Sequence, residues 1–336
     1  MADAKATGNQ VLVKELSKRY EYDGVQTCAA DGMCAVSCPV HIDTGELVRR
    51  LRSEAQSAIA QRGGVFAARH WKSVTKVMAA SLTLSRLARP VLGKRLEAVP
   101  SGGKSRRAIT AVNPDVIFFP SCLNSLFAPD ESSLGVQRAF LTLCERAGIS
   151  VAVPEGIEGL CCGTPWKSKG LVSGHAVAKN QAIDAISKAR AGRKIPVVSD
   201  STSCTQGLDE FEDALSFVAR RVLPRLNISK TIESITLHPT CSGIELGLND
   251  DMSLIAKAVA TDVVIPQNWA CCGFAGDRGM LRPELTQSAT KAEAKEVKSL
   301  ATTRYASSNR PCEIAMTRAT GESYVHLIEV LEEVSR

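Results

Sequence analysis

The residues of this chain best suited to chemistry are its cysteines, of which there are twelve among 336 residues. Most of them stand in clusters or adjacent pairs. Residues 1–10 are polar and lack the apolar stretch of a secretory signal, so a disulfide framework is not expected. Cysteines in a chain without export signals indicate metal or redox chemistry, with buried, unreactive thiols as the alternative. The clustering favours metal.

The first cluster is Cys28-Ala-Ala-Asp31-Gly-Met-Cys34-Ala-Val-Ser-Cys38-Pro39. Its spacing is that of a ferredoxin-type 4Fe–4S motif, C-x2-C-x2-C-x3-C-P, with Asp31 in place of the second cysteine. Zinc sites usually show two separated pairs, so we favour iron–sulfur over zinc. We predict a 4Fe–4S cluster, or a 3Fe–4S cluster without the corner iron, near Cys28, Asp31, Cys34 and Cys38. Alternatively, Asp31 caps the next turn and Cys38 reaches toward another part of the chain.

A longer cysteine pattern occurs twice. A single cysteine is followed by an adjacent pair with glycine, and then by one more cysteine 42 or 40 residues after the pair. The matching residues lie 119, 110 and 108 positions apart. Such a duplication in register is not expected of inert thiols. The predicted metal ligands are Cys122, Cys161, Cys162 and Cys204 in the first copy, and Cys241, Cys271, Cys272 and Cys312 in the second.

Strand and helix patterns alternate through both copies, which predicts an α/β fold with parallel sheets. Apolar, β-branched runs predict buried strands at 115–120, 150–153, 195–200, 235–239 and 262–266. Helical patterns occupy 134–147, 176–191, 252–260 and 284–301. A closing helix is predicted over 321–336, with Tyr324, Leu327, Ile328 and Leu331 on one face. Four thiolates supplied by strand ends and loops would then meet at the carboxyl edge of a sheet. Cys144 falls inside a helical pattern, has no counterpart in the second copy, and is expected in the core.

Positive charge is concentrated between Arg49 and Arg107, where fourteen Lys and Arg face two acids for a net charge of +12. Trp71, Val74, Met78 and Leu82 recur there at helical spacing. A solvated helix face is the default interpretation. Docking to an acidic partner or to anionic lipid is the functional alternative. No recognition motif supports nucleic-acid binding.

These patterns divide the chain into five parts, with Pro90, Pro100 and Ser101–Gly103 marking a linker. We expect an N-terminal tail (1–20), a small helical iron–sulfur domain (21–63), a basic helical connector (64–110) and two duplicated α/β domains (111–228 and 229–336). His41 and His238 stand beside cysteines, and a structural role is favoured for each over iron ligation.

The segments around Cys161-Cys162-Gly163 and Cys271-Cys272-Gly273 resemble the two cysteine-rich "CCG" domains of the superfamily that contains heterodisulfide reductases and the glycolate oxidase iron–sulfur subunit. The leading run, from Tyr22 to Gly45, is similar to the C-terminal iron–sulfur region of bacterial FAD-linked D-lactate dehydrogenases. Together the motifs cover nearly everything from Tyr22 onward. The chain departs from the superfamily where a closing C-x2-C is usual: it has Ser201 and Asn309 before Cys204 and Cys312. Four cysteines a copy, instead of five, argue against the superfamily's noncubane cluster.

The resemblance implies an electron-transfer module of a D-2-hydroxy acid dehydrogenase, with one cluster in the ferredoxin-like run and one or two in the repeats. Electrons would come from FAD on a partner domain or subunit and go to a quinone or cytochrome. Neither Gly273–Gly279 nor Gly103-Lys104-Ser105 has the context of a nucleotide site, so no flavin is expected in this chain. The catalytic residues and the status as an enzyme by itself stay open.

Two other functions remain as alternatives. One is a heterodisulfide-reductase-like protein that performs catalysis at its own repeat cluster, and the other is a zinc-bound structural scaffold. No apolar run approaches the ~18–20 residues of a membrane helix. We therefore expect a cytoplasmic protein, peripheral at the cytoplasmic face of the inner membrane if the basic stretch docks on lipid.

Overall fold

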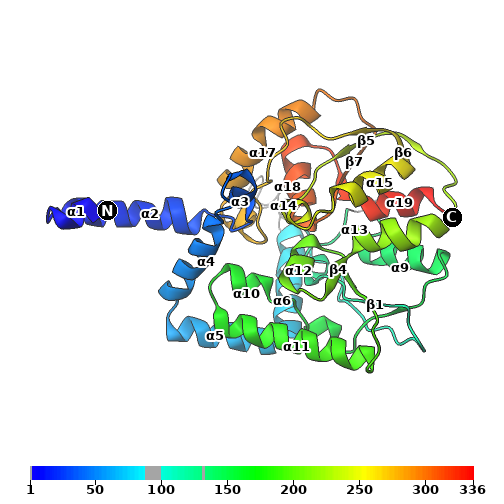
Figure 1. The fold of residues 1–336 in the computed structure, drawn as a ribbon, viewed down its shortest axis with the longest axis horizontal. Helices are drawn as coiled ribbons and strands as arrows, with labels where there is room; N and C mark the ends of the chain where they lie inside the picture. Colours follow the sequence, from blue (N-terminus) through cyan, green and yellow to red (C-terminus); the bar gives the residue numbers. More distant parts are fainter. Residues whose placement is uncertain (1, 88–99, 131–132) are drawn as a thin grey trace.

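The computed structural model describes residues 2–87, 100–130 and 133–336. It confirms the predicted α/β class: two four-stranded sheets, each entirely parallel, follow an N-terminal group of helices (Figure 1). Pro90 of the predicted linker lies outside the described residues.

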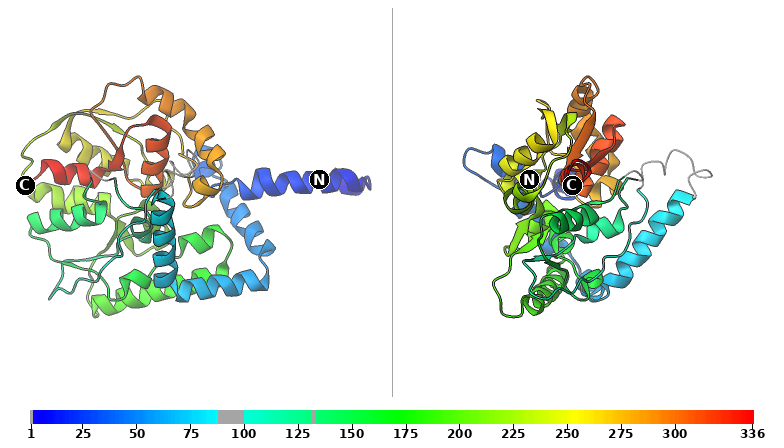
Figure 2. Two further views of the ribbon diagram at one scale, coloured as in Figure 1. Left: turned by 180° about the vertical axis from the view of Figure 1, so that it is seen from behind. Right: turned by 90° about the vertical axis from the view of Figure 1, so that its right-hand side faces the viewer.

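The N-terminal part is helical. α1 and α2 project from the body in Figures 1 and 2, and no residue of α2 is buried. After a turn of π-helix and the short α3, helices α4 to α6 return along the first repeat, where α5 packs against α11 and α6 against α8. The elements are α1 (Ala2–Ala6), α2 (Gln10–Tyr20), η1 (Glu21–Gln26), α3 (Met33–Ser37), α4 (Thr44–Ala55), α5 (Ala58–Arg69) and α6 (Trp71–Leu87).

The first repeat forms a sheet in the order β2-β1-β3-β4. Its strands are β1 (Val116–Phe118), β2 (Val151–Ala152), β3 (Val197–Ser199) and β4 (Phe211–Asp213). Its helices are α8 (Cys122–Leu126), α9 (Val136–Arg146), η3 (Ile157–Gly159), α10 (Thr164–Ser168), α11 (Val172–Arg190), α12 (Thr202–Gly207), α13 (Ala214–Phe217), η4 (Val218–Val222) and η5 (Leu223–Arg225).

The second repeat has the same topology, β6-β5-β7-β8, so the sequence duplication is also a duplication of fold. Its strands are β5 (Ile232–Leu237), β6 (Ala260–Val264), β7 (Arg304–Ser307) and β8 (Tyr324–His326). Its helices are α14 (Cys241–Glu245), α15 (Asn249–Val259), α16 (Arg278–Leu281), α17 (Pro283–Val297), α18 (Arg310–Thr320) and α19 (Leu327–Val334).

The five predicted strands are present, but three more were missed: β4, β7 and β8. The closing segment is a strand followed by a helix, so the prediction of one helix over 321–336 was wrong for Tyr324, which lies in β8. On α6 the predicted apolar face is only partly covered: Trp71 is buried, whereas Met78 is 39% exposed.

A hydrophobic core joins the two repeats. α9 and α13 of the first repeat pack against α19 and α15 of the second. The main cluster of buried residues accordingly includes Phe140 and Leu143 beside Ile255 and Leu331. The two sheets are therefore held together by one shared core. Among the described residues, no helix is both long enough and apolar enough to cross a membrane.

Candidate metal centres

The cysteines of both repeats lie where the strands of each sheet end. Cys122 follows β1 and Cys204 follows β3, while the pair Cys161-Cys162 lies in the connection after β2. In a sheet of order 2-1-3-4, β1 and β3 flank the point where the winding reverses, and ligands in open parallel sheets bind at that point. The second repeat repeats this arrangement after β5, β7 and β6. The predicted position at the carboxyl edge is the one observed.

In the first repeat the four thiols are buried and form two close pairs. The Sγ atoms of Cys122 and Cys161 are 3.6 Å apart, and those of Cys162 and Cys204 are 3.4 Å apart. Each of the four residues is at most 4% exposed. All twelve cysteines, every one of them in the described ranges, are free thiols. Because buried thiols make only weak hydrogen bonds, such a set is well suited to a soft metal.

The contacts of this site lower the pKa of two of its four thiols. A bond from Cys161, opposed by burial and helped by the Arg106 charge, lowers the pKa of Cys122. Contacts with Cys161 and Cys204 hold the pKa of Cys162 well below its usual value. The pKa of Cys161 is raised by its contacts with Cys122 and Cys162, and that of Cys204 by its contact with Cys162. Arg106 is itself fixed by donating to the carbonyls of Pro120 (2.8 Å) and Leu160 (2.6 Å).

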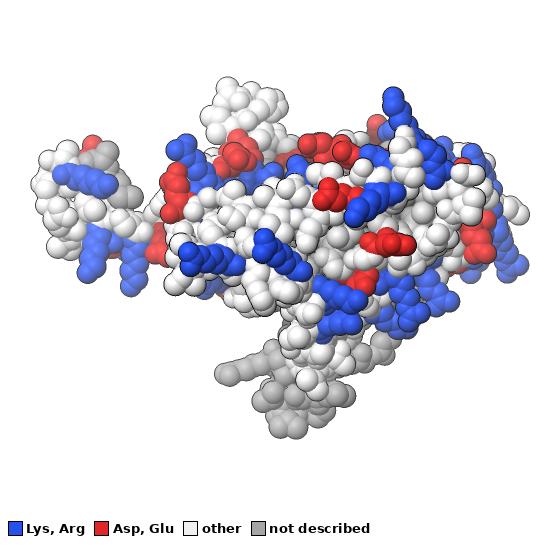
Figure 3. Space-filling view, turned by 90° about the horizontal axis from the view of Figure 1, so that it is seen from below, with Lys and Arg blue, Asp and Glu red and all other residues white. Residues whose placement is uncertain are grey.

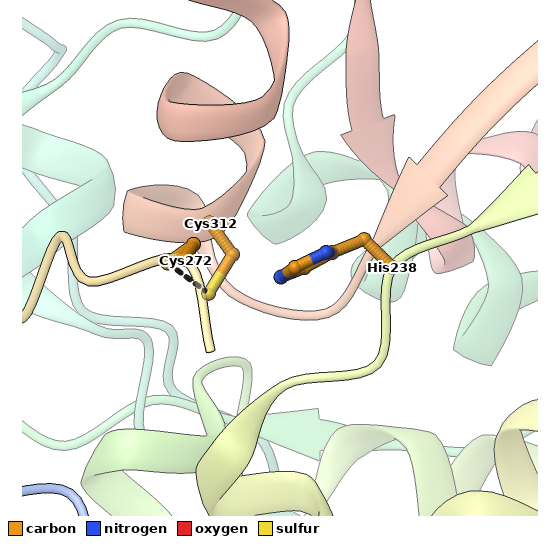
Figure 4. A group of neighbouring side chains, drawn as sticks. All are labelled: His238, Cys272 and Cys312. Carbon is orange, nitrogen blue, oxygen red and sulfur yellow. Dashed lines mark hydrogen bonds between the residues drawn. The ribbon is translucent and has the colours of Figure 1, made fainter. Parts of the chain in front are cut away.

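The second repeat divides its ligand atoms into two groups. Cys272 and Cys312 have sulfurs 3.3 Å apart, and a ring nitrogen of His238 lies within 4.8 Å of both (Figure 4). Asp31, from the N-terminal run, lies equally close to Cys241 and Cys271. In the second repeat a histidine nitrogen and a carboxylate oxygen therefore lie beside the four cysteines. In the first repeat the candidate ligand atoms are the cysteine sulfurs.

His238 belongs to a buried ion pair. Its Nδ1 is 2.8 Å from the Glu293 carboxylate, and both side chains are 1% exposed. Burial by itself lowers the pKa of His238, but the interaction with Cys272 and the bond to Glu293 raise it, to about 9. The pair was not predicted from sequence. The signal was present in His238-Pro-Thr-Cys241, but Glu293 lies 55 residues away.

In the N-terminal run, nearby backbone amides donate hydrogen bonds to the cysteine sulfurs. Cys28 accepts from the amide of Ala30 at 3.3 Å, and Cys34 accepts from that of Thr44 at 3.3 Å. Cys38 is partly exposed, and the amides of Ile42 and Val40 lower its pKa. Asp31 accepts weakly from Met33, at 3.4 Å, in addition to facing the second repeat. His41 is exposed.

One cavity lies between the two repeats and the N-terminal run. It has a volume of about 370 Å³ and is lined by Asp31 of the run, by Cys122, Cys162 and Cys204 of the first repeat, and by Cys241 of the second. Apolar side chains, among them Trp71, Phe127 and Met280, complete its walls. The ion pair between Lys169 and Asp277 (2.6 Å) joins the two repeats beside it.

Ser201 and Asn309, which stand three residues before the last cysteine of each copy, face each other. Ser201 donates to Asn309 Oδ1 at 2.9 Å, and Asn309 donates to Ser203 at 2.7 Å. These buried bonds join the two repeats and occupy the polar groups that could otherwise have bound a metal. Cys144 is fully buried in α9, and burial raises its pKa to about 12, in agreement with its expected place in the core.

Two comparisons agree with this architecture. The family model of the CCG cysteine-rich domain matches residues 116–209 and 235–317, more than half of the chain. Each matched segment holds one complete set of four cysteines. Lactate utilization protein A 1 of Bacillus mycoides (strain KBAB4) is 24% identical over 208 residues, which cover 54% of this chain and 80% of that relative.

Proposed function

The chain belongs to the family of proteins built from the CCG cysteine-rich domain, and on that premise we propose that it is an iron–sulfur electron-transfer module of a lactate-oxidising system. The observation that carries the proposal is the gathering of free thiols from both repeats and Asp31 of the N-terminal run around one cavity. The relative named for lactate utilization supports the choice of substrate.

The residues present fit such a cofactor. Four buried cysteines at one sheet edge offer the soft sulfur ligands that iron–sulfur clusters use, and the pKa of two of them is lowered. When bound at these thiols, an iron–sulfur cluster supplies one-electron transfer. The chain's own residues exclude water, since the thiols of the first repeat are nearly inaccessible, and Arg106 places positive charge beside the ligands.

The finer assignment follows the resemblance of the sequence. Cys28, Cys34 and Cys38, with Asp31, would hold a 4Fe–4S or 3Fe–4S cluster, and the two sets of four cysteines would hold one or two more. The chain would receive electrons from the FAD of a partner domain or subunit that oxidises a D-2-hydroxy acid, with D-lactate as the first candidate. It would then deliver them to a quinone or a cytochrome.

Metal analysis of the anaerobically purified protein tests the proposal. Iron and acid-labile sulfide are expected, with an EPR signal after reduction. Cys161→Ala is expected to lower the iron content, because it removes a ligand. Cys144→Ala is the matched control: it removes an equally buried thiol in the core and should leave iron unchanged. Zinc without iron, or equal iron in both variants, would contradict the proposal.

Docking through the basic stretch is part of the same proposal. Figure 3 shows the face on which α5 and α11 lie, with Lys and Arg side chains spread over it and acids between them. Exposed Ile59 and Phe66 of α5 add apolar area. Flotation with anionic liposomes and capture by the flavoprotein are expected to weaken when Arg62 and Arg69 are replaced by Gln. If the variant binds both the liposomes and the flavoprotein as well as the wild type does, this face is not the docking surface.

A second function is favoured by the cavity. Its apolar walls and its cysteines from both repeats would suit a small substrate reduced at the chain's own site, as in a heterodisulfide-reductase-like protein. Turnover of a disulfide by the iron-loaded chain without any flavoprotein would favour this alternative over the relay.

A further inference from the structure

The His238–Glu293 pair has an unused nitrogen beside two thiols. Nδ1 faces the carboxylate at 2.8 Å, whereas Nε2 is buried and has no partner of hydrogen-bond geometry among the described residues. The imidazole points toward Cys272 and Cys312 in Figure 4, and the three ligand atoms lie within 4.8 Å of one another. A buried polar atom without a partner is unfavourable, so its retention here needs an explanation.

The fold itself does not require the pair. Phe119 stands three residues before Cys122, as His238 stands three residues before Cys241, and it packs on Phe211 with ring centroids 5.1 Å apart. α11 occupies in the first repeat the place of α17 in the second. Its buried residues are Gly174, Ala178, Ala182 and Ile186, with no acid, whereas α17 buries Glu293. In the first repeat, the packing of Phe119 on Phe211 thus fills the core where the second repeat has a buried ion pair.

We propose that His238, oriented by Glu293, is a nitrogen ligand of the metal bound by the second repeat, alongside Cys272 and Cys312. The first repeat then binds through thiolates alone and the second through a mixed nitrogen and sulfur set. This inference rests on the proposed function, because it needs metal at these sites.

The geometry matches the known distances of such ligands. Metal–sulfur bonds of about 2.3 Å and metal–nitrogen bonds of about 2.0–2.1 Å place ligand atoms around one ion within the separations found here. Ligating histidines commonly donate their second ring N–H to a carboxylate, which sets the tautomer and the ring orientation. Glu293 takes that part by accepting from Nδ1, and metal binding at Nε2 releases the proton that the contact with Cys272 favours there in the metal-free chain. Glu293 is a positioning residue.

A mixed site also differs in its redox properties. Replacing thiolate by neutral imidazole reduces the negative charge on the metal and raises its reduction potential, as histidine does in Rieske centres. We therefore expect the second repeat to be the more oxidising of the two sites, and His238→Cys to shift its potential downward.

Spectroscopy of the wild-type holoprotein tests this without a mutation. The chain is grown with [15N]histidine, purified anaerobically, and examined by pulsed EPR after reduction and by X-ray absorption at the edge of the metal found. A strong nitrogen coupling that changes on labelling, together with imidazole scattering, is expected. The absence of both in a metal-loaded chain overturns the inference but leaves the proposed function intact. Zinc in place of iron overturns the relay, and the zinc edge still decides the ligand.

Variants then assign the nitrogen to one residue. His238→Phe, which copies Phe119, is expected to remove the coupling, while Glu293→Ala lowers metal affinity at this site by about 10- to 100-fold. His326→Asn is the matched control, because His326 is also buried but caps α19 by accepting from Ile328 at 3.2 Å. His41→Gln controls for the N-terminal run. Coupling retained in His238→Phe, or lost in either control, contradicts the assignment.

Discussion

At the residue scale, the two cysteines of an adjacent pair contact different partners. Cys161 and Cys162 are adjacent in sequence, yet one contacts Cys122 and the other Cys204. One pair therefore connects the ends of two strands. Gly163 follows at φ +92°, where a Cβ would lie 2.7 Å from the His175 ring, so glycine is needed for both the backbone angle and the space. The chemistry depends on this turn as much as on the thiols.

The stability of the protein should depend on pH through the buried carboxyl group of Asp213. Burial raises its pKa to about 7, although bonds from Leu215 and Thr205 oppose the shift. The folded state thus binds a proton more tightly than the unfolded state, so its contribution to stability is complete below about pH 4 and is lost as the pH rises to about 7. Each pKa unit corresponds to about 1.4 kcal/mol.

The measurement is the free energy of unfolding of the holoprotein in denaturant at several pH values. Asp213→Asn keeps the side-chain oxygen that caps α13 but removes the titration, so its stability should fall less between pH 4 and 7. Parallel pH profiles for the two proteins would show that Asp213 does not titrate in this range.

At the scale of elements, the strands that were missed have identifiable causes. β7 reads Arg-Tyr-Ala-Ser, with little of the apolar, β-branched character that predicts a buried strand. β8 runs directly into α19, so Tyr324 fitted the helical spacing of Leu327, Ile328 and Leu331. Pairing with β7 decided its conformation, and that pairing is remote in sequence.

Glycines let α5 and α11 approach closely. A Cβ on Gly174 would lie 2.8 Å from the backbone of Gly64, whose carbonyl accepts from Trp166 Nε1 at 2.9 Å. Gly174→Ala should therefore destabilise the protein, by roughly 1–3 kcal/mol, since the helices must separate. Denaturant unfolding measures the change.

Gly63→Ala is the control for helix propensity. It lies in α5 beside Gly64, and its Cβ would meet no atom within 4 Å. This variant should gain roughly 0.5–1 kcal/mol. Similar stabilities for the two variants would mean that the contact between α5 and α11 tolerates a methyl group at Gly174.

At the scale of the whole molecule, arginines hold the N-terminal run between the repeats. Arg52 of α4 is 7% exposed and donates to the carbonyls of Val25, Cys28 and Ser168. Arg278 of the second repeat also donates to Cys28. The run is thereby tied to both repeats, which brings Asp31 to the edge of the cavity.

Replacing Arg52 should release the run. Arg52→Gln removes the guanidinium donors of the part-buried carbonyls of Val25 and Ser168, at a cost of about 1–3 kcal/mol each. Hydrogen exchange in residues 25–38 should then accelerate, by about tenfold per 1.4 kcal/mol, while the repeats keep their protection. Arg50→Gln on the same helix is the control, because its side chain is 77% exposed and paired only with Glu54 among the described partners. Equal exchange in both variants would refute this role for Arg52.

The amino-acid sequence by itself determined the α/β class, the duplication and the strand-end positions of the repeat cysteines. These properties follow from local periodicity and from spacing, both of which can be read along the chain. Tertiary structure alone decided which polar side chains meet: Asp31 with Cys241 and Cys271, His238 with Glu293, and Ser201 with Asn309. Such contacts join residues 55 to more than 200 positions apart. They depend on how helices and sheets pack, which no local pattern specifies.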